Sequence, residues 1–189
     1  MIEKFTFDIE APAYGLLSRL EHENQKFTAT KTMKRKMVLV KNDCELRTHI
    51  VLKLLAFVLY YDPRLQIEMD LGMHYKPDLS IPGDHGIPEM WIDCGQVAPK
   101  KVESLSTKLK NTRLCVVKEN QRDMDVFRKL IEKKLDRPER VEYLAFDKGF
   151  AAGMADSLQR SNEVTLYQVM ENVIGVVLNQ QVFESALYR

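Results

Sequence analysis

The chain has 189 residues, of which 45% are hydrophobic and 29% charged, enough apolar material for a single globular α/β domain over residues 1–189. Its 28 Lys and Arg against 27 Asp and Glu leave a net charge of +1, which excludes a general attraction to nucleic acid, so any such surface must be local. Three cysteines without CxxC spacing exclude a disulfide framework, and the lack of an apolar run of about 18 residues or of a leader predicts a cytoplasmic protein away from membranes.

The N-terminal third is predicted to hold two strands and a helix. Apolar and polar residues alternate over Lys4–Ile9, and Thr32–Val40 forms a second, basic strand. We expect the segment between them to be a connector with some helix. Polar residues from Asn42 favour a helix N-terminus, and apolar residues at helical spacing continue to Asp62-Pro63.

The basic run that begins at Lys31 allows two interpretations. Its lysines and arginine either contact phosphates as a local patch or guard a solvated edge strand. In both cases Met33 and Met37 are expected to face the core.

The middle of the chain predicts a meander followed by a helix and a strand. Three short extended runs, split by Gly and Pro residues, favour antiparallel pairing; they are Leu65–Leu71, Met73–Ile81 and Glu89–Cys94. A helix then runs from Pro99 to about Lys110, and Leu114–Val117 is apolar enough for a strand inside a sheet.

The C-terminal part continues with helices and strands. A charged helix is predicted over Asp123–Lys134, a strand over Val141–Phe146 and a helix over Gly149–Gln159. The valine-rich tail, Val164–Leu187, favours strands and a terminal hairpin, although part of it also fits helical spacing. We therefore expect a mixed sheet that the strands at both chain ends extend.

Two aspartates lie on adjoining predicted strands. Asp78 follows Pro77, and Asp93 sits in an apolar run where an ionised carboxylate needs a partner. If the two runs pair as a hairpin, the carboxylates meet at one end of the sheet. Because Mg²⁺ needs only one or two carboxylates besides substrate phosphate, the pair predicts a magnesium site that Mn²⁺ could also fill. The alternative is that both are ordinary solvated aspartates.

Other residues near this pair have candidate roles. Lys100 and Lys101 begin the next helix, where a cation would stabilise charge developing on a phosphoryl group. Cys94 is interpreted as a small apolar filler and not a nucleophile. Glu45 either serves the metal or closes a capping box, and His49, one turn further, shares its helix face. No P-loop, dinucleotide-binding turn or serine-hydrolase elbow occurs in the sequence.

Two segments resemble the bacterial YaeQ family. They are Cys44–Ile67, which contains Leu52-Lys-Leu-Leu-Ala56, and the run Trp91-Ile92-Asp93-Cys94-Gly95. The resemblance implies membership of the restriction-endonuclease-like superfamily, named after its PD-(D/E)xK motif, with a core of helix, three-stranded meander, helix and strand.

Carried over to this sequence, the resemblance makes Pro77-Asp78 the PD pair and Asp93-Cys94-Gly95 the second acidic tripeptide. The metal ligands would be Asp78, Asp93 and the Cys94 backbone carbonyl, with Glu45 beside them. Gly95 stands where the superfamily has its lysine. Lys100 or Lys101 would supply that cation from the next helix, or Gln96 would take the polar position near the metal.

Two functions therefore remain open. The first is a Mg²⁺-dependent nuclease that hydrolyses DNA phosphodiester bonds. The second is a catalytically degenerate nuclease-fold module that binds nucleic acid or a protein partner, because a fold alone does not establish activity.

Overall fold

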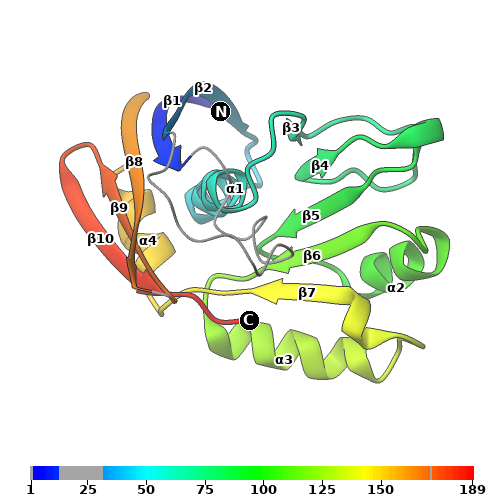
Figure 1. Cartoon of the computed structure of the whole chain (residues 1–189). Coiled ribbons are helices and arrows are strands. Elements are labelled where there is room, and N and C mark those ends of the chain that lie inside the picture. The colour runs from blue at the N-terminus through cyan, green and yellow to red at the C-terminus, as the bar shows by residue number, and fades with distance from the viewer. Residues whose placement is uncertain (1, 13–31, 171) are drawn as a thin grey trace.

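The computed structural model describes residues 2–12, 32–170 and 172–189 (Figure 1). The connector predicted before Thr32 lies outside these ranges. The strands are β1 (Glu3–Pro12), β2 (Thr32–Lys41), β3 (Gln66–Ile67), β4 (Leu79–Ile81), β5 (Met90–Cys94), β6 (Arg113–Val117), β7 (Val141–Leu144), β8 (Ser161–Met170), β9 (Val173–Leu178) and β10 (Gln181–Ala186). The α-helices are α1 (Arg47–Leu59), α2 (Pro99–Lys108), α3 (Gln121–Glu132) and α4 (Phe150–Asp156).

The strands form two five-stranded mixed sheets. One has the order β10-β9-β8-β1-β2 and the other the order β3-β4-β5-β6-β7. The prediction that the terminal strands extend the central sheet is wrong: they pair with one another, since β1 lies antiparallel to β2 and parallel to β8. The predicted terminal hairpin is confirmed in β9 and β10, and the helical alternative for the tail is wrong.

Helix α1 explains why a second sheet is needed. Its ten residues from Ile50 to Leu59 are all buried, and all except Lys53 are apolar, so the helix needs covering on every side. Figure 1 shows α1 between the two sheets, with α4 nearby. One apolar cluster joins α1 to both sheets, so the terminal sheet buries the side of α1 that the central sheet leaves open.

The central sheet has the predicted order. β3, β4 and β5 form the antiparallel meander, and β5, β6 and β7 are parallel, with α2 and α3 as the crossovers. The first two strands are shorter than predicted; Glu68 adopts a positive φ and ends β3 after Ile67, and β4 begins only at Leu79. A second apolar cluster packs α2 and α3 on the face opposite α1. The sheet is thus covered on both faces.

The basic strand β2 is an edge of the terminal sheet. Lys34 and Lys36 are exposed and lie 3.4 and 3.8 Å from carboxylates of Glu10 and Asp8 on β1. Met33 and Met37 are buried, as predicted. These contacts fit the edge-strand interpretation of the run. Within the described ranges, no helix is both long and apolar enough to cross a membrane.

Candidate functional site

The two predicted carboxylates lie opposite each other at one end of the central sheet. β4 pairs with β5 so that Leu79 faces Ile92, which places Asp78, the residue before β4, across from Asp93. The Asp78 backbone N–H donates to the Ile92 carbonyl at 3.1 Å and continues this pairing. The structure thus brings together the two strand positions that the sequence singles out.

Asp78 is held by two donors. Its Oδ2 accepts a hydrogen bond from the Cys94 backbone N–H at 2.7 Å and lies 3.1 Å from His49 Nε2. Burial alone would raise the pKa of Asp78, but the His49 contact and the Cys94 N–H outweigh it and lower the pKa below its ordinary value. Asp78 is therefore a carboxylate stabilised in its charged form.

Asp93 has a different environment. Its side chain is 4% exposed, and the Lys101 ammonium donates to its Oδ1 at 2.7 Å. Burial raises the pKa of Asp93 and the nearby charge of Asp78 adds to this, while Lys101 opposes both. Lys101 also donates to the Lys76 carbonyl at 2.9 Å, which fixes its ammonium against the strand end.

A charged cluster around the buried Lys53 of α1 adjoins Asp78. Glu45, in the turn before α1, places its Oε1 2.7 Å from His49 Nδ1 and 2.6 Å from Lys53 Nζ. Lys53 is 1% exposed and also contacts Glu68 Oε1 at 2.7 Å. Burial lowers the pKa of Lys53, but the two carboxylates outweigh it and raise the pKa above its ordinary value. These contacts link Glu45 to Asp78 through His49.

Glu45 also makes the contact expected of a capping residue. Its Oε2 accepts from the Asn42 backbone N–H at 3.2 Å. Helix α1 begins later than predicted, however, with Leu46 as its N-cap residue. The Asn42 contact therefore closes the turn before the helix, while the other carboxylate oxygen faces the cluster.

The two aspartates are contacted by partners from opposite sides of the sheet. Ile92 packs in the cluster with α1, whereas Trp91 packs against α2 and α3, and strand alternation puts Asp93 on the Trp91 side. Asp78 turns at the strand end toward His49 on the α1 side. In the described part of the chain, no three His, Cys, Asp or Glu side chains are grouped closely enough to form a ready metal site. Carboxylate oxygens are the ligands that a hard cation such as Mg²⁺ prefers, and it takes one or two of them from a protein, so metal binding by Asp78 and Asp93 stays a prediction.

The other residues predicted for the site differ in how exposed they are and in whether they reach the aspartates. Lys101 reaches Asp93, whereas Lys100 and Gln96 are exposed to solvent. The Cys94 thiol is buried and burial raises its pKa well above the ordinary value, which agrees with an apolar filler. Its backbone N–H is used by Asp78; the metal-binding role of its carbonyl stays a prediction.

Sequence reasoning missed Lys53, Glu68 and Lys118. Lys53 interrupts an otherwise apolar helix, and that interruption was a signal of a buried ion pair. Lys118 directly follows the apolar strand β6, at the carboxyl end where α/β sheets place their ligands. Its Nζ donates to the Gly95 carbonyl at 2.7 Å.

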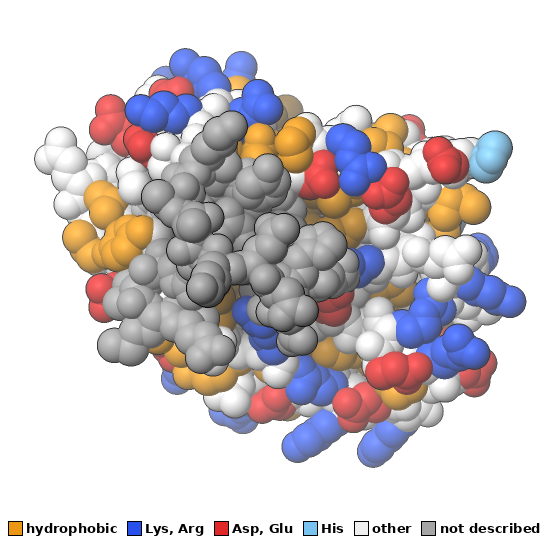
Figure 2. All heavy atoms as spheres, in the orientation of Figure 1, with side chains coloured by type: hydrophobic (Ala, Val, Ile, Leu, Met, Phe, Trp, Pro, Cys, Tyr) orange, Lys and Arg blue, Asp and Glu red, His pale blue; other side chains and the backbone are white. Residues whose placement is uncertain are grey.

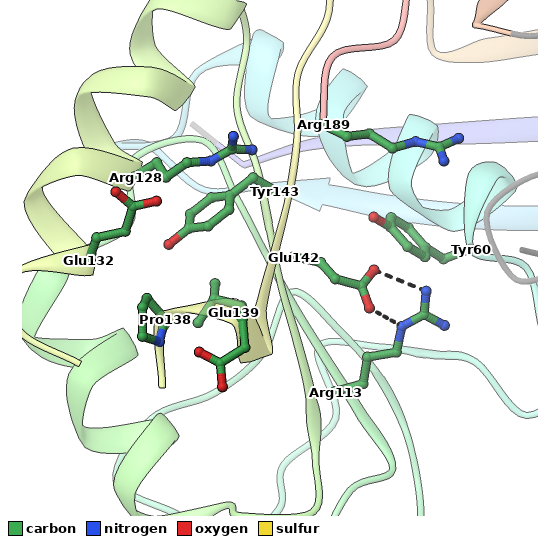
Figure 3. A pocket seen from close by; sticks show the side chains of 10 residues that line it. Tyr60, Arg113, Arg128, Glu132, Pro138, Glu139, Glu142, Tyr143 and Arg189 are labelled. Atoms are coloured by element: carbon green, nitrogen blue, oxygen red, sulfur yellow. Dashed lines mark hydrogen bonds and ion pairs between the residues drawn. The ribbon is translucent and has the colours of Figure 1, made fainter. Parts of the chain in front are cut away.

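A separate hollow of ≈ 450 Å³ lies at the other end of the sheet (Figure 3). It is lined by the amino ends of β6 and β7, by α3 and by Tyr60, with a paired Arg113 and Glu142 on one side. None of the predicted site residues lines it. This hollow is thus distinct from the carboxylate site.

The fold and site define a mixed α/β protein with a buried helix between two sheets and paired carboxylates at one strand end. The sequence profile described as YaeQ protein matches residues 30–186, and the chain therefore belongs to the YaeQ family. The match confirms the resemblance to this family and extends it to the C-terminal strands β8, β9 and β10.

Two solved structures share the fold. The YaeQ protein from Xanthomonas axonopodis pv. citri aligns with a TM-score of 0.74 and 16% identity over 99% of this chain and 97% of that chain. The YaeQ protein from Pseudomonas syringae aligns with a TM-score of 0.71 and 15% identity over 99% of this chain and 93% of that chain. At this identity the likeness concerns the fold alone. A comparison with curated proteins gives no match.

Proposed function

We propose that this protein is a Mg²⁺-dependent nuclease of the restriction-endonuclease-like type, which hydrolyses DNA phosphodiester bonds at the Asp78–Asp93 end of the central sheet. The observation that carries the proposal is the pairing of these aspartates across β4 and β5, with the Lys101 ammonium 2.7 Å from Asp93. The order of α1, the meander, α2 and β6 also agrees with the core that the PD-(D/E)xK resemblance implies.

Each residue has a defined role in this proposal. Asp78 and Asp93 would hold Mg²⁺, with the Cys94 carbonyl and Glu45 as further oxygen donors. When bound, Mg²⁺ would polarise the phosphate and acidify a coordinated water. Lys101 balances the buried charge of Asp93, and His49 orients Asp78. On the described part of the face in Figure 2, basic and acidic side chains are intermixed, so DNA would be held by local contacts at the site.

Cleavage assays with and without metal test the proposal. Purified protein is incubated with plasmid and with single- and double-stranded oligonucleotides in Mg²⁺, Mn²⁺ or EDTA. We expect metal-dependent cleavage that Asp93→Asn reduces by about 10²-fold or more, since it removes a metal ligand. Glu103→Gln, an exposed change of the same chemical kind on α2, is the control and should cleave like the wild type. Intact DNA in every condition would contradict the proposal.

The second candidate is a binding module that keeps the nuclease fold without cutting. Gly95 favours it, because no side chain stands at the position of the superfamily's lysine. Calorimetric titration with Mg²⁺ separates the two. Binding that Asp78→Ala abolishes supports the enzyme, and no binding at millimolar Mg²⁺ supports the module.

A further inference from the structure

Lys118 lies beside the position at which the lysine is missing. β5 and β6 pair in parallel up to Cys94 and Val117, so Gly95 and Lys118 are the next residues of the two strands. The Gly95 N–H donates to the Val117 carbonyl at 2.8 Å, and the Lys118 ammonium donates to the Gly95 carbonyl at 2.7 Å. The neighbouring strand thus delivers an ammonium group to the backbone of residue 95.

The Lys118 side chain is on the same face of the sheet as Asp93. Its Nζ lies 4.0 Å from the ring centre of Phe127 on α3, and Phe127 packs in the same cluster as Trp91. Because Trp91 and Asp93 share a strand face, Lys118 lies on the side of the sheet from which Lys101 contacts Asp93.

A side chain at residue 95 would point elsewhere. Gly95 has a φ of +68°, and a Cβ built there would lie 3.6 Å from His49 Cδ2 and 3.7 Å from Leu52 Cδ1, toward α1. A lysine at this position would therefore leave the Asp93 face and meet the α1 cluster. Lys118 therefore places an ammonium group on the Asp93 face, which a side chain at residue 95 could not do.

The surroundings of Lys118 suit a reactive cation. The residue is 7% exposed, and burial lowers its pKa to about 8, while the carboxylates of Asp123 and Asp93 oppose the shift. The ammonium is thus only partly compensated by protein charge. An anion that approaches the strand ends would improve its environment.

We propose that Lys118 is a catalytic residue of the phosphodiester site, where its ammonium takes the place of the lysine absent at Gly95 and contacts a non-bridging oxygen of the scissile phosphate. The inference rests on the proposed nuclease function. Water adds its hydroxyl group to phosphorus as the bond to the leaving oxygen breaks, and its second hydrogen ends on that oxygen. Lys118 stabilises the charge that grows on the non-bridging oxygen and transfers no proton. Lys101 remains the partner of Asp93.

The first test measures the Lys118 ammonium directly and does not require cleavage. In protein carrying ¹³C-labelled lysine, the Cε signal missing from Lys118→Arg identifies Lys118. We expect it to titrate with a midpoint near pH 8 and the dinucleotide TpT, added with Ca²⁺, to raise this midpoint, since a phosphodiester anion favours the ammonium. A midpoint that TpT leaves unchanged would overturn the inference.

The second test compares cleavage rates. Lys118→Met should lower kcat by about 10²-fold with a smaller change in KM, and Lys118→Arg should retain more activity because it keeps the charge. Circular dichroism checks that both variants fold, and Lys108→Met, exposed on α2, should cleave normally. Undiminished kcat in Lys118→Met overturns the inference. If the wild type cuts no DNA, the nuclease proposal fails and the TpT titration alone decides whether Lys118 recognises a phosphodiester.

Discussion

Asp78 and Asp93 are neighbours across two strands, yet their surroundings shift their pKa values in opposite directions. Asp78 accepts two hydrogen bonds and has a lowered pKa, whereas burial raises the pKa of Asp93. Groups whose pKa values are pushed apart at one site are a frequent feature of catalytic centres. Because the two pKa values shift in opposite directions, the contributions of Asp78 and Asp93 to the free energy of unfolding should depend on pH in opposite ways.

We predict opposite pH profiles for Asp78→Asn and Asp93→Asn. A lowered folded-state pKa means that ionised Asp78 stabilises the fold above about pH 4, the unfolded value, and that this contribution is lost as the pH falls through the folded pKa. Asp78→Asn should therefore cost about 1–3 kcal/mol at pH 7 and little in acid. Ionised Asp93, with a raised pKa, weakens the fold, so the stability of wild type relative to Asp93→Asn should fall as the pH rises above about 4.

Urea unfolding of the two variants and the wild type between pH 3 and pH 8 measures these profiles. Each variant is the matched control for the other, since both remove one carboxylate charge from the same strand end. Parallel profiles of the same sign would contradict the assigned environments.

At the scale of elements, Lys53 joins α1 to the start of the central sheet. Its buried ammonium lies between Glu45, before the helix, and Glu68, directly after β3. We predict that Lys53→Met lowers the free energy of unfolding by about 2–4 kcal/mol, because two partly buried carboxylates lose the cation that they share. Adding Glu45→Gln and Glu68→Gln to Lys53→Met should restore part of this loss.

Urea unfolding followed by circular dichroism measures the Lys53 variants. Lys108→Met is the control, an exposed lysine on α2 whose loss should change stability by less than about 0.5 kcal/mol. If Lys53→Met were as stable as this control, Lys53 would have no anchoring role for α1.

The order of elements in the central sheet could be predicted from periodicity and turn residues, and so could the two aspartates at its end. Lys101 could be placed because Pro99 starts its helix one turn beyond the strand. The choice between Lys100 and Lys101 could not be made, since it depends on which side of α2 faces Asp93. The place of Lys118 after β6 was visible in the sequence, but its contact with Gly95 was not, because Gly95 follows another strand and only the parallel register brings the two together.

At the scale of the whole molecule, the terminal sheet joins the two ends of the chain. The parallel pairing of β1 with β8 links residues about 155 positions apart, such as Thr6 with Ser161. A local sequence pattern does not predict a pairing over this separation. Alternation along β1 and valine along the tail indicate strands, but not their partners. This is why one extended sheet was expected and two sheets were found.

Asn162 makes hydrogen bonds that connect the N-terminal strand β1 with the start of β8. It is buried, and its Nδ2 donates to the Thr6 carbonyl at 3.1 Å and to the Gln159 carbonyl at 2.7 Å. We predict that Asn162→Ala lowers the free energy of unfolding by about 1–2 kcal/mol, because partly buried backbone carbonyls on both sides lose their donor. Denaturant unfolding checks this against Asn111→Ala, an exposed change that should be nearly neutral; equal stabilities would contradict the role of Asn162.

The left-handed backbone at Gly95 has a consequence for how such proteins are recognised and re-engineered. Gly95→Lys would place a lysine where the PD-(D/E)xK pattern has one. It would also strain the left-handed backbone and direct the new amine toward His49, so this single substitution would not bring a lysine to Asp93. Pattern searches that require an acidic residue and a lysine two positions later will pass over chains of this kind. If the proposed nuclease site is right, a search for a lysine at the carboxyl end of the adjacent parallel strand would find such chains, because the lysine there comes from another strand.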